Sequence, residues 1–183
     1  MPEALLIVDF QNDFTPPDGA LAVPEGDEIA GRLNALASDE RFDLVVATRD
    51  WHPADHMSFR DQGGPWPRHC VQGTPGAQLH PALDRAHIDA VIDKGQLRDT
   101  DGYSAFESTA LRELFAERGI TAVTVVGLAT DYCVLTTARD ALREGLAVTV
   151  DTSAIRAVDA TPGDGERALA ELAALGAHLA PDR

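Results

Sequence analysis

The feature that most constrains the fold is a series of short apolar runs alternating with segments of helical periodicity. Ala4–Val8 is apolar at every position, which is typical of a strand covered on both faces. Further strands are predicted at 43–48, 90–93, 121–126, 147–150 and, beginning a short sixth strand, 178–179. Helices are predicted at about 25–38, 108–118, 131–144 and 165–175. This alternation predicts an α/β fold of three layers, with helices on both faces of a mostly parallel sheet of about six strands.

Length and charge narrow the class of protein. A chain of 183 residues has the size of one ordinary domain, so we expect a single domain over 1–183. The net charge of −15 argues against nucleic acid and anionic membranes as partners. The absence of a signal peptide or membrane-spanning run, together with only two cysteines, predicts a cytoplasmic protein. The sequence leaves the oligomeric state open, with a homo-oligomer as one outcome.

Four chemically capable residues follow four of the predicted strands. Asp9 follows the first strand, Asp50 the second, Lys94 the third, and Cys133 the fourth after a short turn. In parallel α/β sheets, ligands bind beyond the carboxyl ends of the strands, near the switch in strand order. We therefore expect these four side chains to meet at one edge of the sheet.

Cys133 is the candidate nucleophile. Thr130 or Asp131 can cap the predicted helix, which places Cys133 in its first turn, where partial positive charge favours a thiolate. The thiol also lies off the centre of the helix's apolar stripe, Val134, Ala138, Ala141 and Leu142. Amides at such a helix start can hold an oxyanion. A buried cysteine is more often a small hydrophobe, however, and that alternative stays open.

Asp9 and Lys94 are candidate partners of this thiol. Asp9 ends an apolar strand, so burial would raise its pKa and allow it to exchange a proton, while Lys94 would oppose that rise. Taken singly, an Asx turn at Asp9 and a solvated lysine at 94 explain these residues better.

The segment from Asp50 to about His80 is predicted to be irregular but ordered, and its Asp/His set suggests one metal ion. Asp50 and His52 lie two residues apart, so in extended chain they project to one side, with His56 and His69 as further candidates. Carboxylate and imidazole ligands suit zinc, iron or manganese. In extended chain Cys70 would point away from its neighbour, which favours packing over ligation.

Together, these motifs resemble those of a known family, the nicotinamidases (pyrazinamidases) of the isochorismatase-like cysteine hydrolases. The resemblance covers nearly the whole chain and is carried by Val8–Phe14 (VDFQNDF), Thr48–Phe59 (TRDWHPADHMSF), Trp66–Gly76 (WPRHCVQGTPG), Lys94-Gly95 and Gly127–Val134 (GLATDYCV). These segments look like the family's opening, metal, later-histidine, lysine and nucleophile motifs.

The resemblance implies a metal-dependent amidohydrolase that converts nicotinamide, and also pyrazinamide, to the acid and ammonia through a thioester, in NAD salvage. It implies a catalytic triad of Cys133, Asp9 and Lys94, and an oxyanion hole made by the amides of Ala129 and Cys133. It also implies a cis peptide between Leu128 and Ala129.

The resemblance further implies one divalent metal ion, zinc before iron or manganese, held by Asp50, His52 and His69. His56 is a ligand in some members and not in others. Phe14, Trp66 and Tyr103 match positions that wall the ring pocket.

Two alternatives stay open. One is a related amidase or hydrolase that uses the same triad on another small substrate. The other is a non-catalytic protein that keeps the scaffold only to bind a metal or ligand.

Overall fold

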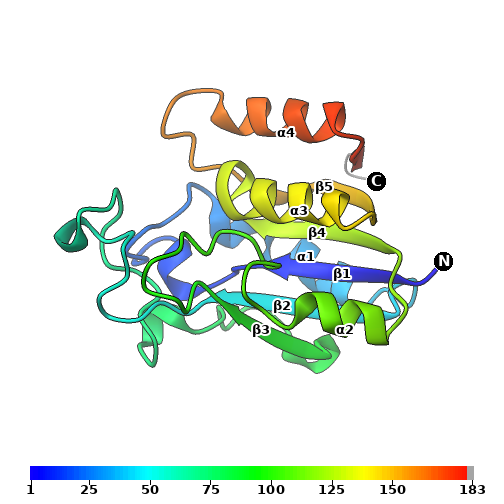
Figure 1. Cartoon of the computed structure of the whole chain (residues 1–183), viewed down its shortest axis with the longest axis horizontal. Coiled ribbons are helices and arrows are strands. Elements are labelled where there is room, and N and C mark those ends of the chain that lie inside the picture. The colour runs from blue at the N-terminus through cyan, green and yellow to red at the C-terminus, as the bar shows by residue number, and fades with distance from the viewer. Residues whose placement is uncertain (181–183) are drawn as a thin grey trace.

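The computed structural model describes residues 1–180 and consists of a six-stranded sheet between layers of helices. The strands are β1 (Glu3–Val8), β2 (Leu44–Asp50), β3 (Ala90–Lys94), β4 (Ala122–Leu128), β5 (Ala147–Arg156) and β6 (His178–Ala180). All neighbours pair in parallel, in the order β3-β2-β1-β4-β5-β6 (Figure 1). The chain builds the sheet outward from β1 to β3 and then crosses to β4, so the switch in strand order lies between β1 and β4.

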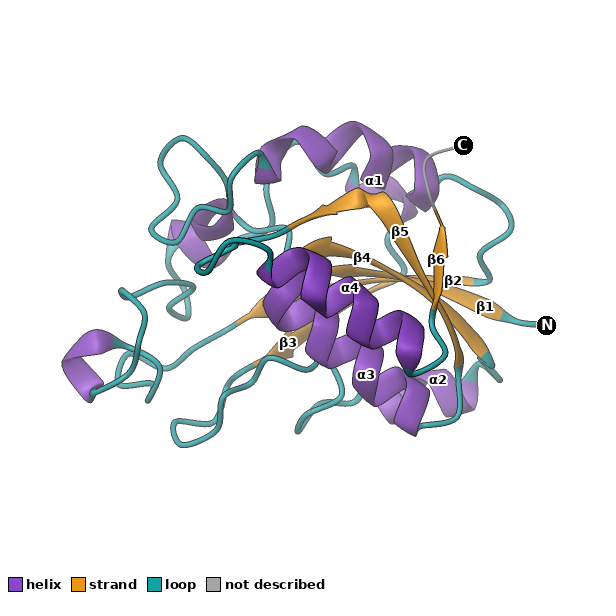
Figure 2. Ribbon diagram, turned by 90° about the horizontal axis from the view of Figure 1, so that it is seen from above, coloured by secondary structure: helices purple, strands orange, loops and turns teal. Residues whose placement is uncertain are grey.

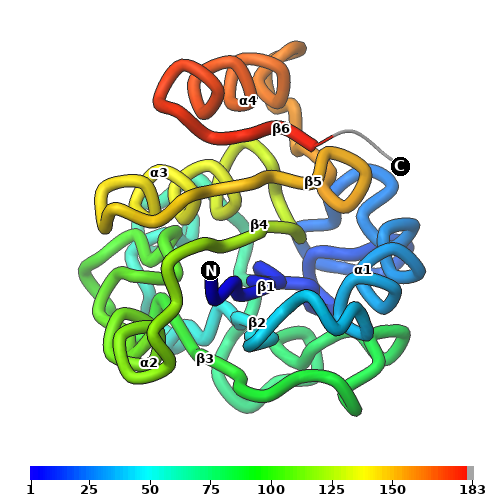
Figure 3. The backbone as a smooth tube through the Cα atoms, turned by 90° about the vertical axis from the view of Figure 1, so that its right-hand side faces the viewer, coloured from blue at the N-terminus to red at the C-terminus, as the bar shows by residue number. Residues whose placement is uncertain are grey.

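Helices cover both faces of this sheet. They are α1 (Ala30–Ala37), α2 (Leu111–Glu117), α3 (Leu135–Arg143) and α4 (Asp164–Ala174). Figures 2 and 3 show α1 on one face and α2, α3 and α4 on the other. The predicted α/β fold with a parallel sheet is confirmed.

The central strand β1 explains why both faces need cover. Its side chains alternate between the two sides of the sheet, and every residue from Ala4 to Val8 is fully buried. Leu5 and Ile7 belong to the core that includes the α1 side chains, whereas Leu6 belongs to the core formed with α2, α3 and α4. An apolar run without polar alternation is what such a strand requires.

Several element boundaries differ from the prediction. Helix α1 begins at Ala30 rather than at about 25, because Gly26–Ile29 forms a 3₁₀ turn before it. Helix α2 begins at Leu111 rather than 108, because Ser108 has a left-handed φ of 54° and cannot be part of a right-handed helix. Strand β5 continues to Arg156 instead of ending at Val150. Asp151, the first residue of this continuation, is buried, and its carboxylate accepts hydrogen bonds from Arg32 of α1.

The connection between β2 and β3 contains no α-helix and crosses the carboxyl edge of the sheet. It has three short 3₁₀ turns, Arg60–Gln62, Pro75–Ala77 and Arg85–His87, as well as isolated bridges such as His52 to Val71. The prediction of an irregular but ordered segment is confirmed. Within residues 1–180, no helix has both the length and the apolar character needed to cross a membrane.

Candidate active site

Sheet register brings the four predicted residues together at the carboxyl edge. Asp50 and Lys94 are direct partners in the pairing of β2 with β3. Gly127 pairs with Val8, and its φ of 111° permits a close approach, since a Cβ there would lie 2.1 Å from the Val8 carbonyl oxygen. This close pairing sets the turn that carries Cys133 beside Asp9.

The Lys94 ammonium lies at the centre of this group and is 1% exposed. Its Nζ donates hydrogen bonds to Asp50 Oδ1 at 2.6 Å, to the Gly102 carbonyl at 3.0 Å and to Cys133 Sγ at 3.3 Å. Asp9 Oδ2 lies 2.8 Å from the same nitrogen. Carboxylate oxygens of Asp9 and Asp50 and the Cys133 sulfur lie within 4.8 Å of one another, but the ammonium supplies the cation for this group.

Burial and charge set the protonation states of these groups. Burial raises the pKa of Asp9 to about 6 although Lys94 opposes the rise, as the sequence predicts. Burial would raise the pKa of Asp50 too, but Lys94 and His52 hold it well below its usual range. Lys94 keeps its proton: burial alone would lower its pKa, and the two carboxylates raise it well above the usual value.

The environment of Cys133 differs from the prediction in two ways. Burial raises the pKa of its thiol well above the usual value, despite Lys94, so the predicted stabilisation of a thiolate is wrong. The helix also begins with a π-helical turn, Thr130–Val134, that has no side-chain cap. The Asp131 carboxylate instead accepts hydrogen bonds from the amides of Val158 and Asp159.

Other expectations for this turn agree with the structure. Cys133 lies within that first turn, and the peptide between Leu128 and Ala129 is cis. Val134, Ala138 and Ala141 are fully buried, as the predicted apolar stripe requires. Cys133 itself is 5% exposed and contacts the core. Its burial alone therefore does not distinguish a nucleophile from a cysteine that only packs in the core.

Asp50, His52 and His69 form the candidate metal centre, with one donor atom of each lying within 4.8 Å of the others. His52 Nδ1 lies 2.8 Å from the Gly95 carbonyl, and His69 Nδ1 lies 2.8 Å from the Pro67 carbonyl. A carbonyl only accepts, so both Nδ1 atoms carry hydrogen, and in the neutral form of either ring the lone pair of Nε2 can bind a metal. One carboxylate and two imidazoles suit a divalent ion.

His56 and Cys70 lie beside this centre. His56 stacks on His52 with ring centroids 3.9 Å apart, and its Nδ1 lies 2.7 Å from Ser58 Oγ. Its buried Nε2 has no hydrogen-bond partner among the described residues, and burial lowers the pKa of this ring to about 4. His56 is not in the three-residue group. Cys70 is fully buried in the core on the α1 side of the sheet, so the prediction that it packs is confirmed.

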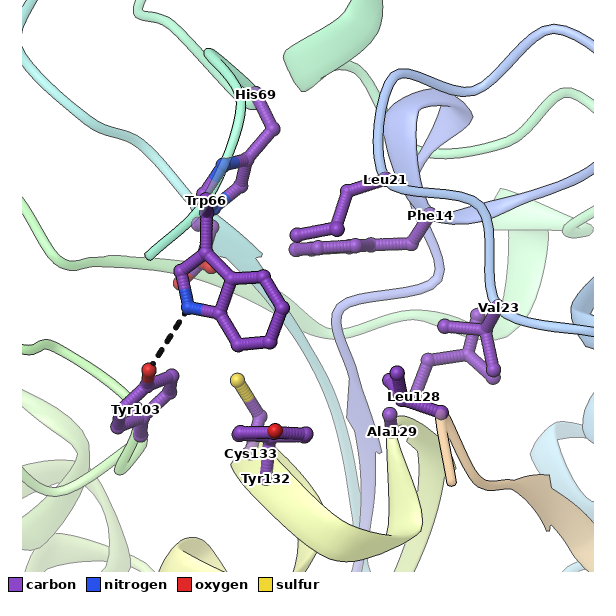
Figure 4. Close-up of a pocket in the computed structure, with 12 residues that line it drawn as sticks. Phe14, Leu21, Val23, Trp66, His69, Tyr103, Leu128, Ala129, Tyr132 and Cys133 are labelled. Carbon is purple, nitrogen blue, oxygen red and sulfur yellow. Dashed lines mark hydrogen bonds between the residues drawn. The ribbon is translucent and has the colours of Figure 1, made fainter. Parts of the chain in front are cut away.

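A small, mostly apolar pocket of about 390 Å³, including its mouth, joins the thiol to the metal centre. Cys133, Asp50 and His69 all line it, together with the three predicted wall residues, Phe14, Trp66 and Tyr103. Figure 4 shows the Cys133 sulfur pointing into this space, and the Trp66 indole N–H donates to the Tyr103 hydroxyl at 3.0 Å. That bond fixes two walls against each other.

Ala129, predicted for the oxyanion hole, also lines the pocket. Its other walls were not predicted from the sequence: Leu21, Val23, Leu128, Tyr132 and Val158. Tyr132 adjoins the nucleophile candidate and packs edge-on against Trp66, with ring centroids 5.1 Å apart. Its place next to Cys133 is a signal that could have identified it. Leu21 and Val158 come from loops whose apolar residues have no local pattern.

Known proteins share this fold and these motifs. Residues 3–181 match the family model of the isochorismatase domain. The chain is 43% identical to a nicotinamidase of Escherichia coli (strain K12), over 97% of this chain and 94% of the relative. It superposes on a pyrazinamidase of Pyrococcus horikoshii in complex with zinc with a TM-score of 0.91, at 44% identity over 100% of both chains.

A second solved structure, PnC1 from L. infantum in complex with nicotinate, has a TM-score of 0.94 at 41% identity and covers 98% of this chain and 92% of that one. The fold thus defines an α/β protein of the isochorismatase-like class. The chain belongs to the isochorismatase family. The resemblance noted from its motifs is confirmed.

Replacing Gly95 should weaken metal binding. In Gly95→Ala the new Cβ would lie 2.6 Å from His52 Cε1, at a φ of 65°, and would displace the ring or its Gly95 carbonyl partner. We expect zinc affinity, measured by calorimetry on metal-stripped protein, to fall about 10–100-fold. Gly63→Ala is the control, because Gly63 also has a positive φ but no atom within 4 Å of its added Cβ. Equal zinc affinities in the two variants would contradict this arrangement.

Proposed function

We propose that this protein hydrolyses nicotinamide, and also pyrazinamide, to the acid and ammonia in the salvage of NAD precursors, with residues 1–183 acting as one hydrolase domain. The observation that carries the proposal is that one small apolar pocket is lined by both the Cys133 thiol and the metal-ligand candidates Asp50 and His69. The nicotinate complex of one structural relative and the zinc complex of another support it.

Substrate binding is assigned to both ends of this pocket. Phe14, Trp66 and Tyr103 would enclose the flat ring. Asp50, His52 and His69 would hold a divalent ion, and we propose zinc. When bound, the ion supplies a Lewis acid that can take the ring nitrogen of the substrate.

The thiol begins the reaction. Asp9 takes the proton of Cys133 as the sulfur attacks the carboxamide carbon and a C–S bond forms. A pKa of about 6 lets Asp9 be ionised near neutral pH and still return a proton. The raised pKa of the Cys133 thiol agrees with proton transfer during the attack rather than with a standing thiolate. The amides of Ala129 and Cys133 are proposed to hold the oxyanion.

The remaining steps release the two products. Asp9 gives its proton to the departing nitrogen, and the C–N bond breaks. Ammonia is released, and the acyl group remains on Cys133 as a thioester. Water then attacks the thioester carbon and loses a proton to Asp9. The C–S bond breaks, the acid is released, and the sulfur regains its proton. Lys94 keeps the side chains of Asp9 and Cys133 next to each other throughout the reaction.

Cys133→Ala should abolish ammonia release from nicotinamide, with a loss on the order of 10⁴-fold or more, because no nucleophile remains. Zinc affinity and the unfolding transition should stay near wild type. Cys70→Ala is the matched control, since Cys70 is the chain's other buried cysteine and lies outside the pocket. Turnover by Cys133→Ala, or a wild type that releases no ammonia, would refute the proposal.

Metal identity has its own test. Stripping the metal should remove turnover of nicotinamide, and reloading should restore it most fully with zinc, less with Fe²⁺ or Mn²⁺. The rates are compared at matched occupancy, determined by elemental analysis. Full activity without any metal would refute the metal's role, and recovery with Mn²⁺ but not zinc would refute the assignment of zinc.

A further inference from the structure

The hydroxyl of Thr48 is bonded to both the backbone and the side chain of Asp9. Thr48 lies in β2 and is fully buried. Its Oγ1 accepts a hydrogen bond from the Asp9 amide at 3.2 Å and donates to Asp9 Oδ1 at 2.7 Å. Asp9 has a left-handed φ of 50°, an unfavourable conformation for aspartate that needs support from its surroundings.

This pair of bonds fixes the direction of the hydroxyl proton. A threonine hydroxyl has one proton, and within residues 1–180 its only partners are the two Asp9 groups. Since the Asp9 amide can only donate, the proton of Thr48 points to Oδ1. Oδ1 is thereby held as an acceptor.

The other carboxylate oxygen has a different environment. Lys94 has three N–H donors, and they go to Asp50, the Gly102 carbonyl and Cys133. Asp9 Oδ2 lies 2.8 Å from the ammonium nitrogen. Because all three donors go elsewhere, Oδ2 has no hydrogen-bond partner in the described part of the chain. A proton on Oδ1 would face the Thr48 hydroxyl proton, so Oδ2 is the better place for an incoming proton.

We propose that Thr48 is a positioning residue that confines the proton exchange of Asp9 to Oδ2, the oxygen available to the Cys133 thiol. The inference rests on the proposed function, because it assigns the proton step of that reaction to one atom. The proton moves from Sγ to Oδ2 during the attack and from Oδ2 to the leaving nitrogen afterwards. Without the Thr48 hydroxyl, Oδ1 is no longer held as an acceptor, and the proton can also go to that oxygen.

Thr48→Val removes the hydroxyl at nearly constant shape, and Thr48→Ser restores it. Thr124→Val is the control, because Thr124 is also a buried strand threonine whose hydroxyl donates to a carboxylate, Glu3 Oε1 at 2.6 Å. Each variant is tested for kcat and KM on nicotinamide and for the rate at which iodoacetamide alkylates Cys133. The alkylation assay needs no turnover, so it still tests Thr48 if the wild type proves inactive on nicotinamide.

Thr48→Val should lower both kcat and the alkylation rate by about tenfold to a hundredfold, with KM within about threefold of wild type. Thr48→Ser and Thr124→Val should stay within about threefold in every measurement. If Thr48→Val shows no cooperative unfolding, Thr48→Ala replaces it with the same expectation. Wild-type rates without the hydroxyl, equal losses in Thr48→Ser, or an equal loss in Thr124→Val would overturn the proposal.

Discussion

The buried ammonium of Lys94 is the interaction on which the rest of this site depends. Two carboxylates, Asp9 and Asp50, lie at most 3% exposed within ion-pair distance of its nitrogen. An uncompensated charge at that depth costs several kcal/mol, so neither carboxylate could stay ionised there alone. The two carboxylates and one ammonium leave a net charge of −1 beside the imidazoles of His52 and His69, which favours a bound cation. The same ammonium contacts the thiol, so one group joins the metal ligands to the nucleophile candidate.

These contacts follow from sheet register rather than from local sequence. Pairing of β2 with β3 sets Asp50 opposite Lys94, and the pairing of β1 with β4 brings Gly127 against Val8. The switch in strand order then opens the crevice between β1 and β4. A shift of one residue in either pairing would send these side chains to the opposite face of the sheet.

Much of this arrangement could be predicted, because strand order in a parallel sheet dictates what meets at its carboxyl edge. Apolar runs located the strands, and the residues after them gave Asp9, Asp50, Lys94 and Cys133. The depth of burial could not be predicted from a pattern, so the pKa of the Cys133 thiol was expected in the wrong direction. Asp131 was expected as a cap, whereas its carboxylate bonds the Val158 amide, 27 residues away. Loop walls such as Val158 depend on tertiary packing. The catalytic roles of the site residues remain predictions.

The most direct test of the account is the unfolding free energy of metal-free wild type and Lys94→Met, measured with urea at about pH 8 and about pH 5. Removal of the ammonium should cost about 3–5 kcal/mol at the higher pH, because two buried carboxylates lose their compensating charge. Without Lys94 their pKa values rise in the folded state, so stability is lost as the pH rises and is recovered as it falls. The account therefore predicts a smaller difference between the two proteins at pH 5. No loss at pH 8, or the same loss at both pH values, would contradict it.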